Sequence, residues 1–306
     1  MLLKKHQSQK ILEHTLQHIK ENLFDHVVHL SEIIGPRHVS CISSLNQAAN
    51  YINKIMTQYH SPPQRQTYLV ENNPVCNLIV EKTGWKYPEE IFVIGAHYDT
   101  VFDSPGADDN ASGVAAVLEL LRMLRDYANQ RTLRFIAFTL EEPPFFDTDL
   151  MGSTVYARQC RHNGENIIGM MSLEMLGYYT DAPMSQQYPV KEMTMIYPER
   201  GNFIGIVGNR RSESLTRFFS KSLKETNMIK LETLVADLPA PGIDLSDHAS
   251  FWQQGYPAFM VTDTAFYRFP LYHTAEDRIG HLNFKKFSRL VYGLTIAVKK
   301  LDGQND

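Results

Sequence analysis

Two histidines and three carboxylates, spread over five short segments, are the residue types that a pair of zinc ions requires. They are His97, Asp109, Glu142, Glu174 and His273. Imidazole nitrogen and carboxylate oxygen are common zinc ligands. Four of the five residues end a predicted strand or follow one, which is where open α/β sheets place their active sites. The ordered set therefore predicts a metal centre at one edge of a sheet.

Adjacent glutamates, Glu141 and Glu142, follow an apolar strand predicted at Leu133–Leu140. Two carboxylates at the end of a sheet repel each other unless a cation compensates one of them. A metal ligand beside a general base meets that condition. Glu142 would bind the metal, and Glu141 would accept a proton from an attacking water. A solvated acidic pair is the alternative, and these two residues alone do not decide between the readings.

The remaining candidates are ambiguous one by one. Asp99 lies two residues after His97 and could fix the tautomer of that imidazole, although His97 alone fits a structural histidine better. Asp109 precedes a predicted helix, so it fits an N-cap as well as a bridging ligand. Glu174 ends an apolar strand and needs a partner there. A lone His273 in its loop would be a surface residue.

The segments that must position these residues alternate between strands and helices. Helices are predicted at 8–34, 43–59, 112–127, 152–161, 212–226 and 284–301. Strands are predicted at 66–70, 76–81, 91–96, 133–140, 167–173, 203–207, 232–235 and 257–261, with a turn at 72–74. Such alternation favours a mixed, mostly parallel sheet between helices, an α/β fold of three α/β/α layers. We expect one domain over residues 1–306, with a surface excursion at 180–201 that lacks periodicity.

Composition excludes several classes of protein. The 306 residues are 43% hydrophobic and carry a formal net charge of −4 without a basic stripe, so nucleic acid is not an expected partner. The three cysteines are widely spaced and predict neither disulfides nor a thiolate metal site. The N-terminus lacks the pattern of a signal peptide, and no apolar run is long enough to span a bilayer. We therefore expect a cytoplasmic protein with no membrane partner; its oligomeric state is not predicted.

Together the segments resemble metallopeptidase family twenty-eight, the co-catalytic di-zinc aminopeptidases, which also contains the glutaminyl cyclases. The resemblance covers roughly residues 90–278. Its specific motifs are His97-Tyr98-Asp99, residues 106–113 (Gly-Ala-Asp-Asp-Asn-Ala-Ser-Gly), Glu141-Glu142, residues 246–252 (Ser-Asp-His-Ala-Ser-Phe-Trp) and Tyr272-His273-Thr274.

The resemblance implies two Zn²⁺ ions per chain, bridged by Asp109. Glu142 and His273 would complete one site, and His97 and Glu174 the other. The family often has Asp where this chain has Glu174, which leaves metal affinity and metal choice at that site open. Asp99 resembles the residue that orients His97, and Glu141 resembles the general base. A cis peptide is expected at Asp109-Asn110.

The same resemblance implies an aminopeptidase that hydrolyses N-terminal residues from peptides with a free N-terminus through a metal-activated water. Four further residues are candidates for substrate binding: Asp247, His248, Tyr267 and Arg268. Asp247-His248 fits a helix N-cap equally well. Tyr267 could reach an oxyanion, and Arg268 a carboxylate. Two alternatives remain: a glutaminyl-peptide cyclotransferase, and a catalytically silent binding module on the same fold.

Overall fold

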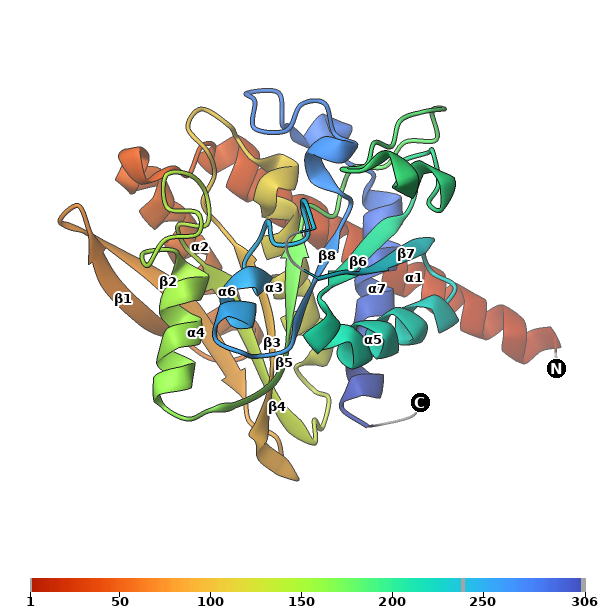
Figure 1. Ribbon diagram of the computed structural model, residues 1–306. Coiled ribbons are helices and arrows are strands. Elements are labelled where there is room, and N and C mark those ends of the chain that lie inside the picture. Colours follow the sequence, from red (N-terminus) through yellow and green to blue (C-terminus); the bar gives the residue numbers. More distant parts are fainter. Residues whose placement is uncertain (1, 238–239, 304–306) are drawn as a thin grey trace.

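An eight-stranded sheet forms the centre of the computed structural model, which describes residues 2–237 and 240–303 (Figure 1). The strand order is β1-β2-β4-β3-β5-β8-β6-β7. The strands are β1 (Gln64–Val70), β2 (Asn73–Lys82), β3 (Tyr87–His97), β4 (Arg131–Phe138), β5 (Asn166–Glu174), β6 (Ile204–Gly208), β7 (Leu231–Val235) and β8 (Ala258–Thr262). The run β4-β3-β5-β8 and the pair β6-β7 are parallel, and the remaining neighbours are antiparallel. The predicted mixed, mostly parallel sheet is confirmed.

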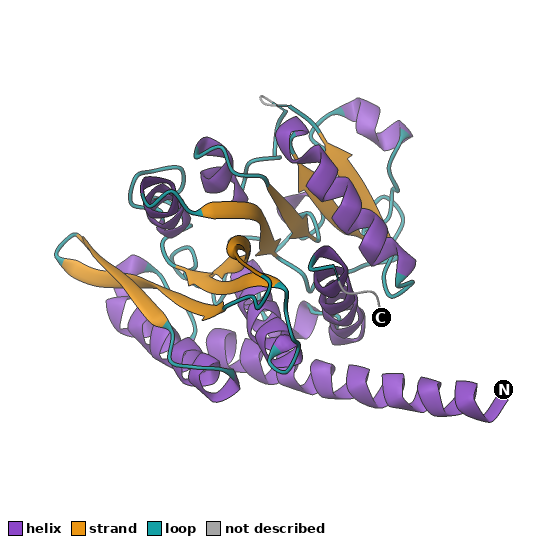
Figure 2. Ribbon diagram, turned by 90° about the horizontal axis from the view of Figure 1, so that it is seen from below, coloured by secondary structure: helices purple, strands orange, loops and turns teal. Residues whose placement is uncertain are grey.

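Helices cover both faces of this sheet. They are α1 (Leu2–Val27), α2 (Ile42–Tyr59), α3 (Gly113–Leu124), α4 (Gly152–His162), α5 (Glu213–Glu225), α6 (His248–Gln253) and α7 (Phe284–Leu301). Helix α3 packs on β3, β4 and β5, with α1, α2 and α7 around it, while α5 packs on β6, β7 and α7. Helices α4 and α6 pack together on the opposite face. The N-terminal part of α1 projects beyond the body of the molecule (Figure 2).

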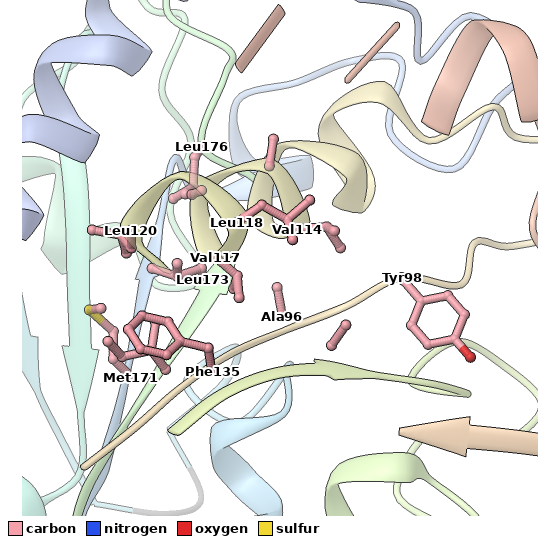
Figure 3. Packing of buried hydrophobic residues seen from close by; sticks show 14 of the residues in the cluster. Ala96, Tyr98, Val114, Val117, Leu118, Leu120, Phe135, Met171, Leu173 and Leu176 are labelled. Carbon is pink, nitrogen blue, oxygen red and sulfur yellow. The ribbon is translucent and has the colours of Figure 1, made fainter. Parts of the chain in front are cut away.

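Packing in the main hydrophobic core explains why α3 lies between the sheet and the helices α1, α2 and α7. Nearly every side chain of this helix is buried, as expected for a helix that is apolar all round. Val117 and Leu120 of α3 lie over strand residues that include Ala96, Phe135 and Leu173 (Figure 3). This packing fixes the N-terminal end of α3 above the ends of β3 and β5, where the candidate ligands lie.

The hairpin between β1 and β2 differs from the prediction. The predicted turn at residues 72–74 is wrong, because Pro74 lies within β2 and pairs with Leu69 of the edge strand β1. The turn residues are Glu71 and Asn72, both with positive φ (49° and 65°). Two central residues with positive φ make the two-residue hairpin turn whose twist matches that of the flanking strands.

Helix boundaries differ by a few residues. The first helix begins at Leu2, and its α-helical part ends at Val27; the segment Val28–Ile34 continues as a π-helix. Within residues 180–201 the described chain contains one short 3₁₀ helix, Lys191–Met195, and otherwise loops. In the described ranges, no helix combines the length and apolar character needed to cross a membrane.

Candidate metal centre

The five candidate ligands converge at the carboxyl ends of neighbouring strands. His97 is the last residue of β3, and Glu174 is the last residue of β5. Glu142 follows β4, Asp109 lies just before α3, and His273 lies in the loop between β8 and α7. Because β4, β3, β5 and β8 are parallel neighbours, these ends meet at one edge of the sheet. Parallel strands thus bring together residues that are far apart in sequence.

Asp109 lies between two groups of side chains. Its Oδ1 is 3.4 Å from Nε2 of His97, and Oε2 of Glu174 is 3.3 Å from the same nitrogen. Its Oδ2 is 3.1 Å from Nε2 of His273, which is 3.2 Å from Oε2 of Glu142. One oxygen of a single carboxylate therefore faces each group, which is the arrangement a ligand shared by two cations would need.

The separations fit a tetrahedral zinc site. Ligand atoms at about 2.0–2.2 Å from a tetrahedral zinc lie about 3.3–3.6 Å apart. The four nitrogen–oxygen separations within these two groups of ligand side chains span 3.1–3.4 Å, close to that value. A further grouping, His97 with Glu141 and Glu142, also converges within 4.8 Å. Glu141 therefore lies close enough to act on whatever the ligands hold.

Several polar atoms of the centre have no hydrogen-bond partner among the described residues. They include Oδ2 of Asp109, Oε1 of Glu142 and Nε2 of His273. His273 and Asp109 approach to 3.1 Å, yet they do not have the geometry of a hydrogen bond. Buried polar groups without partners are rare in proteins and call for an explanation. A metal ion bound between these atoms would explain why they have no partners, so the residues present fit a metal ion.

The electrostatics point the same way. Burial raises the pKa of Glu141 well above its usual value, and the charge of Glu142 adds to the rise. Burial and the charge of Asp109 raise the pKa of Glu142 to about 8. Although burial opposes protonation of His273, the adjacent carboxylates raise its pKa to about 10. Carboxylates crowded in this way retain protons unless cations compensate them, so the centre is built to attract positive charge.

Asp99 supports both sides of the centre. Its backbone carbonyl lies 3.2 Å from Nδ1 of His97, whereas its carboxylate is 3.6 Å from that nitrogen. The carboxylate instead accepts hydrogen bonds from the backbone N–H groups of Glu141 and Glu142, at 3.0 and 3.1 Å. The spacing of His97 and Asp99 predicts an orienting role toward the imidazole, and it does not predict this second contact.

The loop that carries Asp109 is fixed by side chains on both flanks. The carboxylate of Asp277 accepts hydrogen bonds from the N–H groups of Asp108 and Asp109, at 2.9 and 3.0 Å. The amide of Asn110 donates to the carbonyl of Leu173 at 2.9 Å, which joins the loop to β5. The peptide bond Asp109-Asn110 is cis, as expected.

Arg37 is a fully buried residue that sequence reasoning missed. Its guanidinium donates to the carbonyls of Tyr98, Pro105 and Gly106 at 2.7–3.0 Å, and also to those of Leu30 and Gly35. Burial lowers its pKa to about 10, against nearby acids that include Asp277 and Asp99. Arg37 thus ties the N-terminal segment to the loop that leads from His97 to Asp109. Its only sequence signal is a Gly35-Pro36-Arg37 run without periodicity.

Asp247 and His248 lie at the start of α6, fully buried. Asp247 occupies the N-cap position, yet its side chain makes no capping bond and both its oxygens lack partners among the described residues. Burial raises its pKa to about 7, with charges of the centre, such as Glu174, contributing. Nε2 of His248 donates a hydrogen bond to the carbonyl of Ile243 at 2.7 Å. Because a carbonyl oxygen can only accept, this nitrogen carries the proton.

Tyr267 and Arg268 are separated by the structure. Tyr267 lines a pocket beside Glu174, together with Tyr272, which stacks on His273. Arg268 is buried outside that lining, and its guanidinium donates to Gln186 and to the carbonyl of Phe203. Its Nε and Nη1 are thus used within the fold, whereas its Nη2 has no hydrogen-bond partner among the described residues. The contact of Arg268 with a substrate carboxylate stays a prediction.

The chain is similar in sequence to a family of peptidases. The profile described as Peptidase family M28 matches residues 77–294. The chain is 36% identical over 282 residues to the uncharacterized protein YfbL of Escherichia coli, with 90% of this chain and 86% of that protein covered. It is 30% identical over 250 residues to leucine aminopeptidase 1 of Trichophyton equinum, with 76% of this chain and 60% of that protein covered.

Solved structures share the fold. LapB from Legionella pneumophila has a TM-score of 0.72 at 22% identity, covering 95% of this chain and 75% of that one. A zinc aminopeptidase from Bacillus subtilis has a TM-score of 0.70 at 16% identity, covering 92% and 95%. A glutaminyl cyclase from Tannerella forsythia has a TM-score of 0.65 at 16% identity, covering 91% and 98%.

Proposed function

This chain belongs to peptidase family M28 and is a hydrolase, and from that premise we propose that it is a zinc-dependent aminopeptidase. It removes N-terminal residues from peptides with a free N-terminus. The observation that carries the proposal is the position of Asp109, whose two oxygens face two separate groups of ligand side chains.

We assign the ligands accordingly. His97, Asp109 and Glu174 would hold one zinc ion, and Asp109, Glu142 and His273 the other. When bound, the ions would polarise the scissile carbonyl and lower the pKa of a water molecule. Asp99 orients His97 through its carbonyl and holds the backbone of Glu141 and Glu142 through its carboxylate.

Glu141 is the proposed general base. Its Oε2 lies 3.8 Å from Nε2 of His97, so its carboxylate reaches the space between the ligands. It would accept a proton from the attacking water and deliver it to the leaving amine. The side chain of the N-terminal residue would enter the pocket that begins at Glu174.

Mass spectrometry of a defined peptide mixture tests the proposal. The mixture contains free, N-acetylated and N-terminal Gln peptides, incubated with zinc-loaded protein or with chelated protein. We expect chelator-sensitive loss of N-terminal residues from the peptides with free N-termini and not from the acetylated ones.

Other outcomes would contradict the proposal in different ways. Loss of ammonia confined to the Gln peptides would show a cyclase, in keeping with the fold shared with the Tannerella enzyme. Unchanged peptides, together with no tight zinc binding by the apo-protein, would show a silent binding module.

A further inference from the structure

The pocket beside the candidate metal centre lies over the ends of β5, β8, β6 and β7. Much of its wall is aromatic or aliphatic, with side chains such as Tyr188, Tyr197, Phe203, Leu234 and Met260. Within the described chain, Glu174 and Glu232 are the charged residues of its lining. A carboxylate in an apolar wall far from the centre has no part in the proposed chemistry, so Glu232 needs its own explanation.

Strand register places the two glutamates at opposite ends of one row. Glu174 of β5 pairs with Thr262 of β8, Thr262 pairs with Gly205 of β6, and Gly205 pairs with Glu232 of β7. Directly paired residues point to the same face of a sheet, and three strand spacings amount to roughly 14 Å. The two residues between them are small, and a Cβ atom built on Gly205 would meet no atom closer than 3.4 Å. The row is therefore a trough with a carboxylate at each end.

Alternation along β7 confirms which way Glu232 points. Leu231 is buried in the main core, and the hydroxyl of Thr233 bonds to Ser220 of α5 at 2.9 Å. Since alternate strand residues face opposite sides, Glu232 and Leu234 face away from α5 and toward the pocket. The charge of Glu232 also adds to the effect of burial in raising the pKa of Tyr197.

The carboxylate of Glu232 forms no hydrogen bond or ion pair with any other described residue. Burial raises its pKa, and the charge of Lys224 is near enough to oppose that rise. A carboxylate that is partly removed from water and has no partner within the protein can gain from pairing with a cation. A cationic group that enters the pocket would supply the missing partner.

We propose that Glu232 determines specificity for peptides whose N-terminal residue is Lys or Arg, an inference that rests on the proposed aminopeptidase function. The free amine would lie at the Glu174 end. The aliphatic part of the side chain would cross Thr262 and Gly205 between the aromatic walls, and its ammonium or guanidinium would pair with Glu232. With bond lengths near 1.5 Å, an extended Lys side chain reaches roughly 6 Å and a Glu side chain roughly 5 Å. Together with one hydrogen bond of about 3 Å, these lengths span a row of this size.

Calorimetry with two small amino alcohols, which have no amide bond to cleave, tests the pocket without turnover. L-Lysinol and L-norleucinol differ in the terminal ammonium, and each is titrated into zinc-loaded wild type, Glu232→Gln and Glu192→Gln. Glu192 is an exposed acid on the neighbouring 3₁₀ helix, so its variant controls for loss of one charge nearby. We expect wild type and Glu192→Gln to prefer lysinol roughly tenfold or more, and Glu232→Gln to lose the preference. Equal affinities in wild type, or a preference that survives in Glu232→Gln, would overturn the proposal.

Hydrolysis of Lys-Ala and norleucyl-Ala then separates the two hypotheses. The ratio of kcat/KM for the two dipeptides should fall roughly 10- to 100-fold in Glu232→Gln and stay constant in Glu192→Gln. Hydrolysis of norleucyl-Ala without preference for Lys-Ala overturns the role of Glu232 and leaves the aminopeptidase intact. Absence of hydrolysis of both dipeptides removes the proposed function, while the calorimetry still decides whether the pocket selects a cation.

Discussion

The carboxylate of Asp99 accepts a hydrogen bond from the backbone N–H of Glu142, at 3.1 Å, across the ends of two neighbouring strands. The other oxygen of Asp99 accepts the N–H of Glu141 at 3.0 Å. One buried acid therefore fixes the backbone of the proposed base and of a proposed ligand, while its carbonyl orients His97. The proposed base and two proposed metal ligands are therefore all held in position by Asp99.

Asp99→Asn should weaken the centre without unfolding the protein. The substitution places an amide N–H₂ opposite a backbone donor, so the loop after β4 loses one of its two acceptors. We expect zinc affinity or kcat/KM to fall roughly 10- to 100-fold. Competition with a chelator measures the first and peptide hydrolysis the second. Asp103→Asn, at an exposed position of the loop after β3 that also carries Asp99, is the control, and equal behaviour of the two variants would argue against this role.

Glu141→Gln should abolish most turnover and spare metal binding. The amide keeps the size of the side chain but cannot accept a proton from water at neutral pH. We expect a loss of roughly 10²- to 10⁴-fold in kcat, with zinc content unchanged. Steady-state kinetics and metal analysis provide the measurements, with the exposed Glu276→Gln as control. Full activity in Glu141→Gln would assign the base elsewhere.

His273→Ala should reduce the zinc content from two ions per chain to one. His273 faces Asp109 and Glu142, whereas the other proposed site keeps all of its side chains. Mass spectrometry of the intact protein under native conditions counts the ions directly. His281→Ala, an exposed histidine further along the same loop, should retain both. Two ions retained in His273→Ala would show that this histidine is not a ligand.

The buried His26 predicts a pH-dependent stability far from the centre. Burial lowers its pKa from 6.5 to about 4, and Nδ1 lies 2.7 Å from the hydroxyl of Tyr51. Between these values the unfolded chain binds a proton that the folded chain does not, so the free energy of unfolding falls as the pH is lowered from 6.5 toward 4. The lost stability amounts to at most about 3 kcal/mol.

Chemical denaturation at several pH values checks this contribution by difference. The free energy of unfolding of wild type minus that of His26→Gln should decrease over this pH window. The same difference for His14→Gln, at an exposed position of α1, should stay constant. A constant difference for His26→Gln would contradict the assignment.

The sequence predicted the sheet well because its strands carry strong local signals. The apolar run at Ile91–Ala96 and the acidic pair after β4 mark strand ends, and parallel pairing then brings those ends together. The ligand positions follow from the same logic, although their roles remain proposals.

Other features depend on contacts that no local pattern encodes. Arg37 and Asp277 act on backbone groups far away in sequence, and neither lies in a periodic segment. Glu232 is a lone acid in a short strand, and its position opposite Glu174 follows only from the order of β5, β8, β6 and β7. Nearness in sequence to His273 suggests that Arg268 binds substrate, and it does not reveal the hydrogen bond of this side chain to the carbonyl of Phe203.

Arg37 also shows that the residues matched by a family model need not include every residue that holds the proposed metal centre in place. The family match begins at residue 77, and every proposed ligand lies within it. The guanidinium that holds the carbonyls of Tyr98, Pro105 and Gly106 comes from outside. A fragment that contains only the matched residues would keep all five proposed ligands. It would lose the side chain that holds the loop between His97 and Asp109. The family match would not reveal this loss, although the loop between His97 and Asp109 would then lack the hydrogen bonds from Arg37.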